Sequence, residues 1–320
     1  MSEISLSSPR FDFIDNAKMI AILGVVFEHT RHYTDFPVWL SHFIGAYQMP
    51  LFFFISGYLI SQKRMDDTFL EYLHHSAKTL LVPLYIFAFP FIVLSVYRMD
   101  VHTMLLHLTG VNSPYWFFMA LFLSQIFYRV LFGAVKNQYI LLLVCFAISY
   151  ASTFIFSSST YFVLPQTFVA LFFVALGGFV RRKNYSFNLN GKSMIAGLVL
   201  ILPLLLFSSY YVGDMYVLAY GNIHLLFFLR ALVGVSGILF LSCNIAPNST
   251  FQWLSKNTLY IFPLQLYPMM LLTKVSKVMN FPLLMEPPIF YIIAVLSAIL
   301  LGAVAKQVLT RILPSVFPAR

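Results

Sequence analysis

The sequence contains few charged residues for its length. Asp, Glu, Lys and Arg make up 10% of the 320 residues, against about 25% in a soluble globular domain. Hydrophobic residues make up 60%, which is more apolar surface than a water-soluble fold of this size can bury. These proportions exclude the soluble enzyme classes and indicate an all-α, polytopic membrane protein.

Cysteine is equally scarce. Cys145 and Cys243 are the only two, and both lie inside apolar runs. This argues against a disulfide framework and against a zinc site, so we expect no metal. The first 17 residues contain acidic side chains and no apolar run, so we do not expect a cleaved signal peptide. Aromatic residues make up 18% of the chain, which excludes a disordered protein.

Long apolar runs dominate the rest of the sequence. A helix that crosses a bilayer needs about 20 mainly apolar residues, and we find ten such segments, of which 41–61 and 257–275 hold the most polar and proline residues. The connections are short, so we expect one integral-membrane domain over residues 1–320. The predicted spans are 17–34, 41–61, 78–98, 114–134, 138–157, 161–180, 193–212, 223–243, 257–275 and 288–312.

The net charge of +9 is explained by where the basic residues fall between these spans. If the N-terminus is cytoplasmic, fourteen of the 20 basic residues lie on the inner side. The outer side holds only Arg31, Arg98, Lys274 and Lys277. This bias follows the positive-inside rule. It predicts cytoplasmic N- and C-termini in a multi-pass protein of the inner (cytoplasmic) cell membrane, with no nucleic-acid partner.

The first predicted span concentrates ionisable residues, which are costly at membrane depth. Lys18 and His29 are eleven residues apart, so they lie on one helical stripe, about 16 Å apart along the axis. Asp15 precedes Lys18 by three residues and shares that face. Two interpretations are open. Asp15 and Lys18 form an interfacial ion pair while His29 reaches the outer head groups, or the stripe lines a cavity with a proton-handling imidazole at one end.

Other polar and aromatic residues in the spans have alternative roles. Glu28 lies about 100° off the stripe, and we interpret it as interfacial rather than as a partner of His29. Arg230 cannot lose its charge, so it needs an acidic partner or an anionic ligand. Tyr115 and Trp116 either belong to an interfacial aromatic belt or line a substrate tunnel. Ser56 lacks a Gly-x-Ser-x-Gly context, which favours helix packing over nucleophilic catalysis.

Three segments in order carry a family resemblance: FDFIDNAKMIAILGVVFEHT, MPLFFFISGYLI and PYWFFMALF. They resemble the acyltransferase 3 family of integral-membrane acyltransferases, and within it the fucose-4-O-acetylase-like and polysaccharide O-acetyltransferase group. The family motifs fall on Asp15, Lys18 and His29, on Phe54, Ser56, Gly57 and Tyr58, and on Trp116, Phe117 and Leu121.

The sequence departs from the family pattern at two positions. Lys18 stands where arginine is commoner, which keeps the charge but loses the bidentate fork. Gln265 lies near the place where many members carry a histidine on the ninth span. Lysine at position 18 is expected to bind an anionic group less firmly than arginine would. Glutamine at position 265 leaves His29 as the one expected intramembrane base.

The resemblance implies transfer of an acyl group, usually acetyl, from cytoplasmic acetyl-CoA to a sugar hydroxyl of a surface polysaccharide or its lipid-linked precursor. His29 would be the base or a transient acyl carrier, and Lys18, oriented by Asp15, would hold the donor. Arg230 would stabilise the oxyanion or hold Glu28, while Trp116, Tyr115 and Ser56 would contact the acceptor. The candidates for binding the acyl-CoA nucleotide are Lys63, Arg64, Lys78 and Arg181.

Two other functions fit the same features. A transporter or flippase for a lipid-linked sugar or a small anion would also have many spans, broken helices and buried charges, although the sequence shows no matching halves. A regulatory membrane partner that has lost activity is the third alternative, favoured by Lys18 and Gln265.

Overall fold

The computed structural model describes residues 12–60, 62–110, 115–156, 162–184, 191–211, 213–246 and 248–317. Over these ranges the regular elements are helices, apart from one isolated bridge between Asp214 and Ala219, so the predicted all-α class is confirmed. The α-helices are α1 (Asp12–His29), α2 (Val38–Leu59), α3 (Gln62–Asp66), α4 (Phe69–Ser76), α5 (Val82–Tyr97), α6 (Val101–Thr109), α7 (Trp116–Ala134), α8 (Gln138–Ile155), α9 (Leu164–Arg182), α10 (Gly191–Leu206), α11 (His224–Ser242), α12 (Ser249–Lys256), α13 (Thr258–Leu264), α14 (Leu266–Val278) and α15 (Pro287–Ile312).

Seven of the predicted spans coincide with helical segments long and apolar enough to cross a membrane, within the part of the chain that the structure describes. The first predicted span falls on α1, which carries four charged residues. The seventh falls on α10, which has 16 residues. The ninth is divided at Gln265 into α13 and α14. The protein is therefore a multi-pass membrane protein, while the count of ten spans and the cytoplasmic termini stay predictions.

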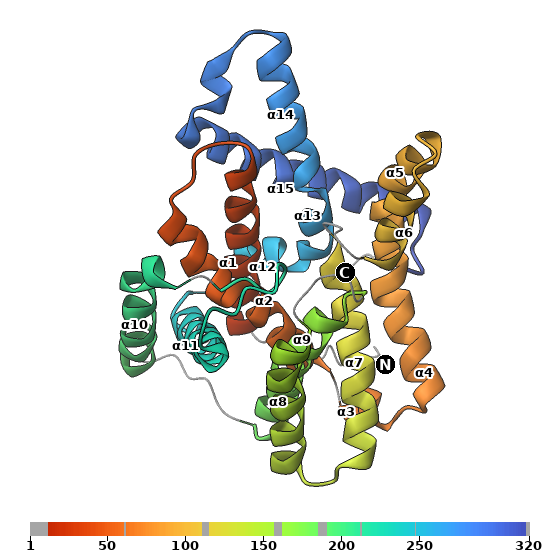
Figure 1. Ribbon diagram of the computed structural model, residues 1–320, viewed down its shortest axis with the longest axis vertical. Coiled ribbons are helices and arrows are strands. Elements are labelled where there is room, and N and C mark those ends of the chain that lie inside the picture. Colours follow the sequence, from red (N-terminus) through yellow and green to blue (C-terminus); the bar gives the residue numbers. More distant parts are fainter. Residues whose placement is uncertain are drawn as a thin grey trace, which may run out of the picture.

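Helix α1 lies among helices from distant parts of the sequence (Figure 1). It packs against α2, α11, α12, α13 and α15. Ile22 and Val25, which lie on the stripe between Lys18 and His29, are fully buried. That stripe therefore faces the protein interior and not lipid, as the cavity interpretation requires. Below, the two ends of this helix are called the Lys18 end and the His29 end.

The closest approach of two helices joins α2 to α9. A Cβ atom added to Gly57 would overlap the backbone of Val174, and one added to Gly177 would overlap the carbonyl of Phe54. Small residues let helix backbones approach closely inside a membrane. The glycine of the Phe-x-Ser-Gly-Tyr motif therefore has a packing role, and Ser56, half-buried beside it, fits the packing interpretation.

Candidate functional site

His29 is the last residue of α1, and its imidazole is fixed by its own helix. Its Nδ1 lies 2.7 Å from the carbonyl oxygen of Val25. A carbonyl only accepts, so Nδ1 is the donor and Nε2 carries the lone pair of the neutral ring. The side chain is 26% exposed, and the Glu28 carboxylate lies 3.8 Å from Nδ1. The ring thus presents a basic nitrogen away from α1, with an anion beside its opposite nitrogen.

The carboxylate of Glu28 is buried inside the protein. Arg31 Nε lies 2.8 Å from it, and Ser41 donates to the same oxygen over 3.1 Å. Arg31 also donates to the Ser41 hydroxyl over 2.9 Å, which closes a three-residue network. The interpretation of Glu28 as an interfacial side chain is wrong, because Arg31 and Ser41 enclose the carboxylate. Of the two alternatives for Arg230, the one in which it holds Glu28 is wrong, because Glu28 pairs with Arg31 and Arg230 donates to Tyr211.

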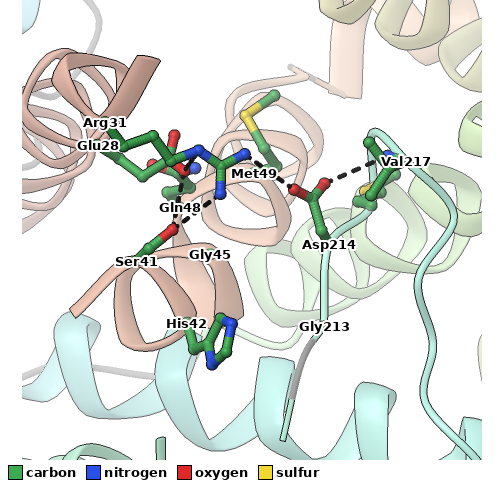
Figure 2. A pocket seen from close by; sticks show the side chains of 11 residues that line it. Glu28, Arg31, Ser41, His42, Gly45, Gln48, Met49, Gly213, Asp214 and Val217 are labelled. Atoms are coloured by element: carbon green, nitrogen blue, oxygen red, sulfur yellow. Dashed lines mark hydrogen bonds and ion pairs between the residues drawn. The ribbon is translucent and has the colours of Figure 1, made fainter. Parts of the chain in front are cut away.

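A pocket of about 160 Å³ opens beside this network. Figure 2 shows Arg31 reaching from Glu28 and Ser41 toward Asp214, whose carboxylate lies 3.6 Å from the guanidinium. We call this space the polar pocket, and its lining residues are Glu28, Arg31, Ser41, His42, Gly45, Gln48, Met49, Gly213, Asp214, Met215 and Val217. One wall is the first half of α2, and the other is the segment 213–217.

The segment 213–217 is held in place by Asp214. Its carboxylate accepts from the backbone N–H groups of Tyr216 and Val217 over 2.7 and 3.3 Å, and its backbone pairs with that of Ala219. Gln166 of α9 donates to the Tyr216 carbonyl over 2.9 Å. A short polar turn is therefore fixed against the bundle, and Asp214 still faces Arg31.

The polar pocket has hydrogen-bond acceptors on Gln48, His42 and Asp214. The Gln48 side-chain oxygen is buried and has no hydrogen-bond partner. His42 Nδ1 lies 3.1 Å from the Ser208 carbonyl, so its Nε2 is an acceptor in the neutral ring. The Arg31 charge is balanced by Glu28 and Asp214. Such a lining suits a neutral molecule with several hydroxyl groups, because hydroxyls supply the missing donors.

Sequence reasoning missed most of this pocket. The sequence pattern does not indicate Ser41, His42 or Asp214 as site residues, and Gln48 is only one of the polar residues within the predicted span 41–61. The available signal was Gln48, an amide within an otherwise apolar run, since polar groups at such positions require partners. Asp214 and Ser41 reach the site only through the tertiary packing of α2 against segment 213–217.

At the Lys18 end, Asp15 joins α1 to α12. Its carboxylate accepts a hydrogen bond of 2.6 Å from the Ser255 hydroxyl and lies close enough to Lys18 to attract its ammonium group. Asn16, the next residue, donates to the carbonyls of Ser242 and Ile245. The orientation of Lys18 by Asp15 stays a prediction.

Several of the basic side chains expected to bind the nucleotide rest on aromatic rings. Arg64 lies 5.1 Å from the centre of the Tyr72 ring, and Arg181 lies 5.4 Å from that of Tyr58. Arg129, which the sequence did not single out, lies 6.0 Å from the Tyr72 ring on the side of α7. Lys63 is exposed on α3, and Lys78 is half-buried after α4. Cation–π contacts help to hold these guanidinium groups in place.

Tyr115 and Trp116 are buried in the bundle. The Tyr115 hydroxyl donates to the Pro263 carbonyl over 3.3 Å, and the Trp116 ring lies 5.7 Å from that of Tyr216. The aromatic-belt interpretation is wrong, because both side chains are buried inside the protein, Trp116 against Tyr216 and Tyr115 against Phe91. Trp116 supports that wall through Tyr216 and is not among the lining residues.

The comparisons with known proteins support one family. A family model described as an acyltransferase domain, of the acyltransferase 3 family, matches residues 11–306. The match covers both ends of α1, the polar pocket and the basic residues named above. No curated protein and no solved structure matches the chain.

Proposed function

The chain belongs to the acyltransferase 3 family and is a membrane acyltransferase; from this premise we propose that it transfers an acetyl group from cytoplasmic acetyl-CoA to a sugar hydroxyl. The acceptor is a surface polysaccharide or its lipid-linked precursor. The observation that supports the proposal most directly is the fixed imidazole of His29, whose Nδ1 donates to Val25. Membership of this family indicates an enzyme, which argues against the transporter and regulatory alternatives.

The donor binds at the Lys18 end in this proposal, and that end faces the cytoplasm. The nucleotide of acetyl-CoA is polyanionic, and Arg64 and Arg181 present guanidinium groups held on Tyr72 and Tyr58. Lys63 and Lys78 add positive charge nearby in sequence. Arginine forks and a positive potential favour phosphate groups. The thin arm of the donor then runs along the Lys18 side of α1 toward His29, with Lys18 holding a polar group of the arm.

The acceptor binds in the polar pocket. Its hydroxyls donate to the unpaired oxygen of Gln48, to His42 Nε2 and to the carboxylate of Asp214. This arrangement favours a sugar over an anionic acceptor, because the acids of the lining already balance Arg31. Glu28 joins the two parts of the site, since it lines the pocket and lies 3.8 Å from His29 Nδ1.

The chemical step requires one base. His29 Nε2 takes the proton of the acceptor hydroxyl, and the oxygen attacks the thioester carbonyl carbon. The C–O bond forms, the C–S bond breaks, and the coenzyme A thiolate takes the proton back from the imidazolium. Glu28 stabilises the imidazolium through Nδ1, because opposite charges at this separation attract strongly in a partly dry site. A transient acetyl group on Nε2 is the alternative route.

Labelled acetyl-CoA added to membranes that contain the protein tests the proposal. We expect label in the glycan fraction and a glycan mass increase of one acetyl group. His29→Ala should lower the rate by about 10²–10⁴-fold, the usual contribution of a positioned base, at unchanged protein level. His102→Ala is the matched control, since that histidine is exposed on α6 and has no role in the step. Undiminished transfer by His29→Ala would contradict the assignment.

A further inference from the structure

Arg230 is the charged residue that the proposed reaction leaves without a role. It lies in α11, its Nη1 donates to the Tyr211 carbonyl over 2.8 Å, and its guanidinium lies 4.6 Å from the centre of the Tyr211 ring. Its Nη2 is buried and makes no hydrogen bond. Among the residues that the structure describes, no carboxylate forms an ion pair with it. A permanent charge with an unused donor at this position calls for an anion.

The space beside Arg230 is apolar. A groove of about 360 Å³ runs between α10 and α11, and its lining residues are Pro203, Leu204, Phe207, Tyr210, Tyr211, Leu226, Leu229, Arg230 and Val233. Arg230 is the only charged member of that lining. The groove lies at the edge of the molecule, where α10 forms the margin of the bundle (Figure 1). Several lining side chains are exposed there, including Phe207 and Leu229.

The position of Arg230 along the groove indicates which end of a bound molecule would be charged and which would be apolar. Arg230 is six residues into α11, about 9 Å below the start of the helix. Its guanidinium nevertheless reaches the carbonyl of Tyr211, in the connection that follows α10. The charged group is therefore near one end of the groove, and Leu204, Leu229 and Val233 continue the apolar surface beside it. An amphiphile with an anionic head and an alkyl chain matches this distribution.

We propose that this groove binds an anionic membrane lipid, with a phosphate oxygen accepting a hydrogen bond from Arg230 Nη2 and one acyl chain lying against Leu204 and Leu229. A free phosphate would leave the apolar walls uncovered. A zwitterionic lipid would bring a second positive charge to a site that lacks an acid. The site does not depend on the acetyl transfer proposed above. It lies next to the polar pocket in sequence, because Gly213 and Asp214 closely follow Tyr211.

Native mass spectrometry of the full-length protein in detergent tests the proposal without using activity. Phosphatidylglycerol and phosphatidylcholine with identical chains are titrated against the wild type and its variants. We expect tighter retention of phosphatidylglycerol by the wild type. Arg230→Gln should weaken that retention about tenfold, the usual effect of losing one hydrogen bond to a charged group. Arg230→Lys, which keeps the charge, should weaken it less. Arg98→Gln, at an exposed arginine after α5, is the matched control.

A second variant separates the lipid from a free phosphate and does not alter the charge. Leu229→Trp fills the groove, so it should reduce retention of phosphatidylglycerol, whereas Leu296→Trp at an exposed position of α15 should not. Equal retention of the two lipids by the wild type would overturn the proposal. So would displacement of phosphatidylglycerol by inorganic phosphate together with no effect of Leu229→Trp, which would identify a phosphate site.

Discussion

The polar pocket at the His29 end and the basic residues expected to bind the donor differ in how their charges are arranged. At the His29 end, Glu28 and Asp214 both pair with Arg31, which leaves one net negative charge beside a pocket in which the Gln48 side-chain oxygen has no hydrogen-bond partner. Among the basic residues outside that pocket, Arg64 and Arg129 rest on the ring of Tyr72, so positive charge gathers around one aromatic side chain. The first arrangement suits a neutral, hydroxyl-rich molecule and the second suits a polyanion. In the proposed function, these two places receive the acceptor and the donor respectively.

The largest effect should come from breaking the balanced network at the His29 end. Glu28→Gln removes the anion and leaves Arg31 facing Ser41 and Asp214. Because Arg31 is partly exposed, water replaces part of the lost interaction, and we expect a loss of about 1.5–3 kcal/mol in the free energy of unfolding, the range of a hydrogen bond to a charged group. Thermal unfolding in detergent measures it. Glu286→Gln, at an exposed acid, should change the midpoint little. Equal shifts in the two variants would show that the network is not stabilising.

The next effect should be specific to the acceptor. Gln48→Leu keeps the volume of the side chain and removes the unpaired oxygen of the polar pocket. We expect the KM for the glycan acceptor to rise about tenfold, the cost of one missing hydrogen bond in a site built to receive it, with the KM for acetyl-CoA unchanged.

Gln265→Leu is the control for that experiment. Gln265 also carries a buried, unpaired side-chain oxygen, but it does not line the polar pocket. Its replacement should leave the KM for the acceptor as it was. If Gln48→Leu raised the KM for acetyl-CoA instead, the assignment of the two ends of α1 would be reversed.

A smaller effect is expected at the Lys18 end. Arg64→Gln and Arg181→Gln each remove one guanidinium from a group of several basic residues, so we expect the KM for acetyl-CoA to rise about threefold to tenfold, with the KM for the acceptor unchanged. Added salt should reduce the difference between wild type and variants, because exposed charges are screened. Initial rates at varied donor concentration measure both effects. Insensitivity of the donor KM to both substitutions would place the nucleotide elsewhere.

The sequence predicted the helices better than the site. Composition and apolar runs predicted seven segments that coincide with helices long and apolar enough to cross a membrane, because residence in a bilayer requires a long apolar run in the sequence. The three other predicted spans do not coincide with such helices. Charged residues interrupt the first, the helix of the seventh is short, and the ninth is broken at Gln265. The stripe of Lys18 and His29 also followed from the helical period alone.

The polar pocket could not be predicted in the same way. It depends on Ser41, His42 and Gln48 of one helix meeting Asp214 from a connection far along the chain. Nothing in the spacing of these residues indicates that contact, since it arises from the packing of α2 against the turn that Asp214 itself stabilises. The burial of Glu28 has the same origin, because Ser41 covers it from α2.

The smallest effect is expected at Lys18, where the chain departs from the commoner arginine of its family. Lys18→Arg keeps the charge beside Asp15 and changes only the hydrogen-bond geometry, a difference of about 0.5–1.5 kcal/mol at most. We therefore expect the transfer rate to stay within about tenfold of the wild type, whereas Lys18→Gln, which removes the charge, should raise the KM for acetyl-CoA further. Rates measured on the same membranes compare the three proteins. An inactive wild type that Lys18→Arg activates would contradict this expectation, because it would mean that the guanidinium fork, and not the positive charge, is what the Lys18 end must supply.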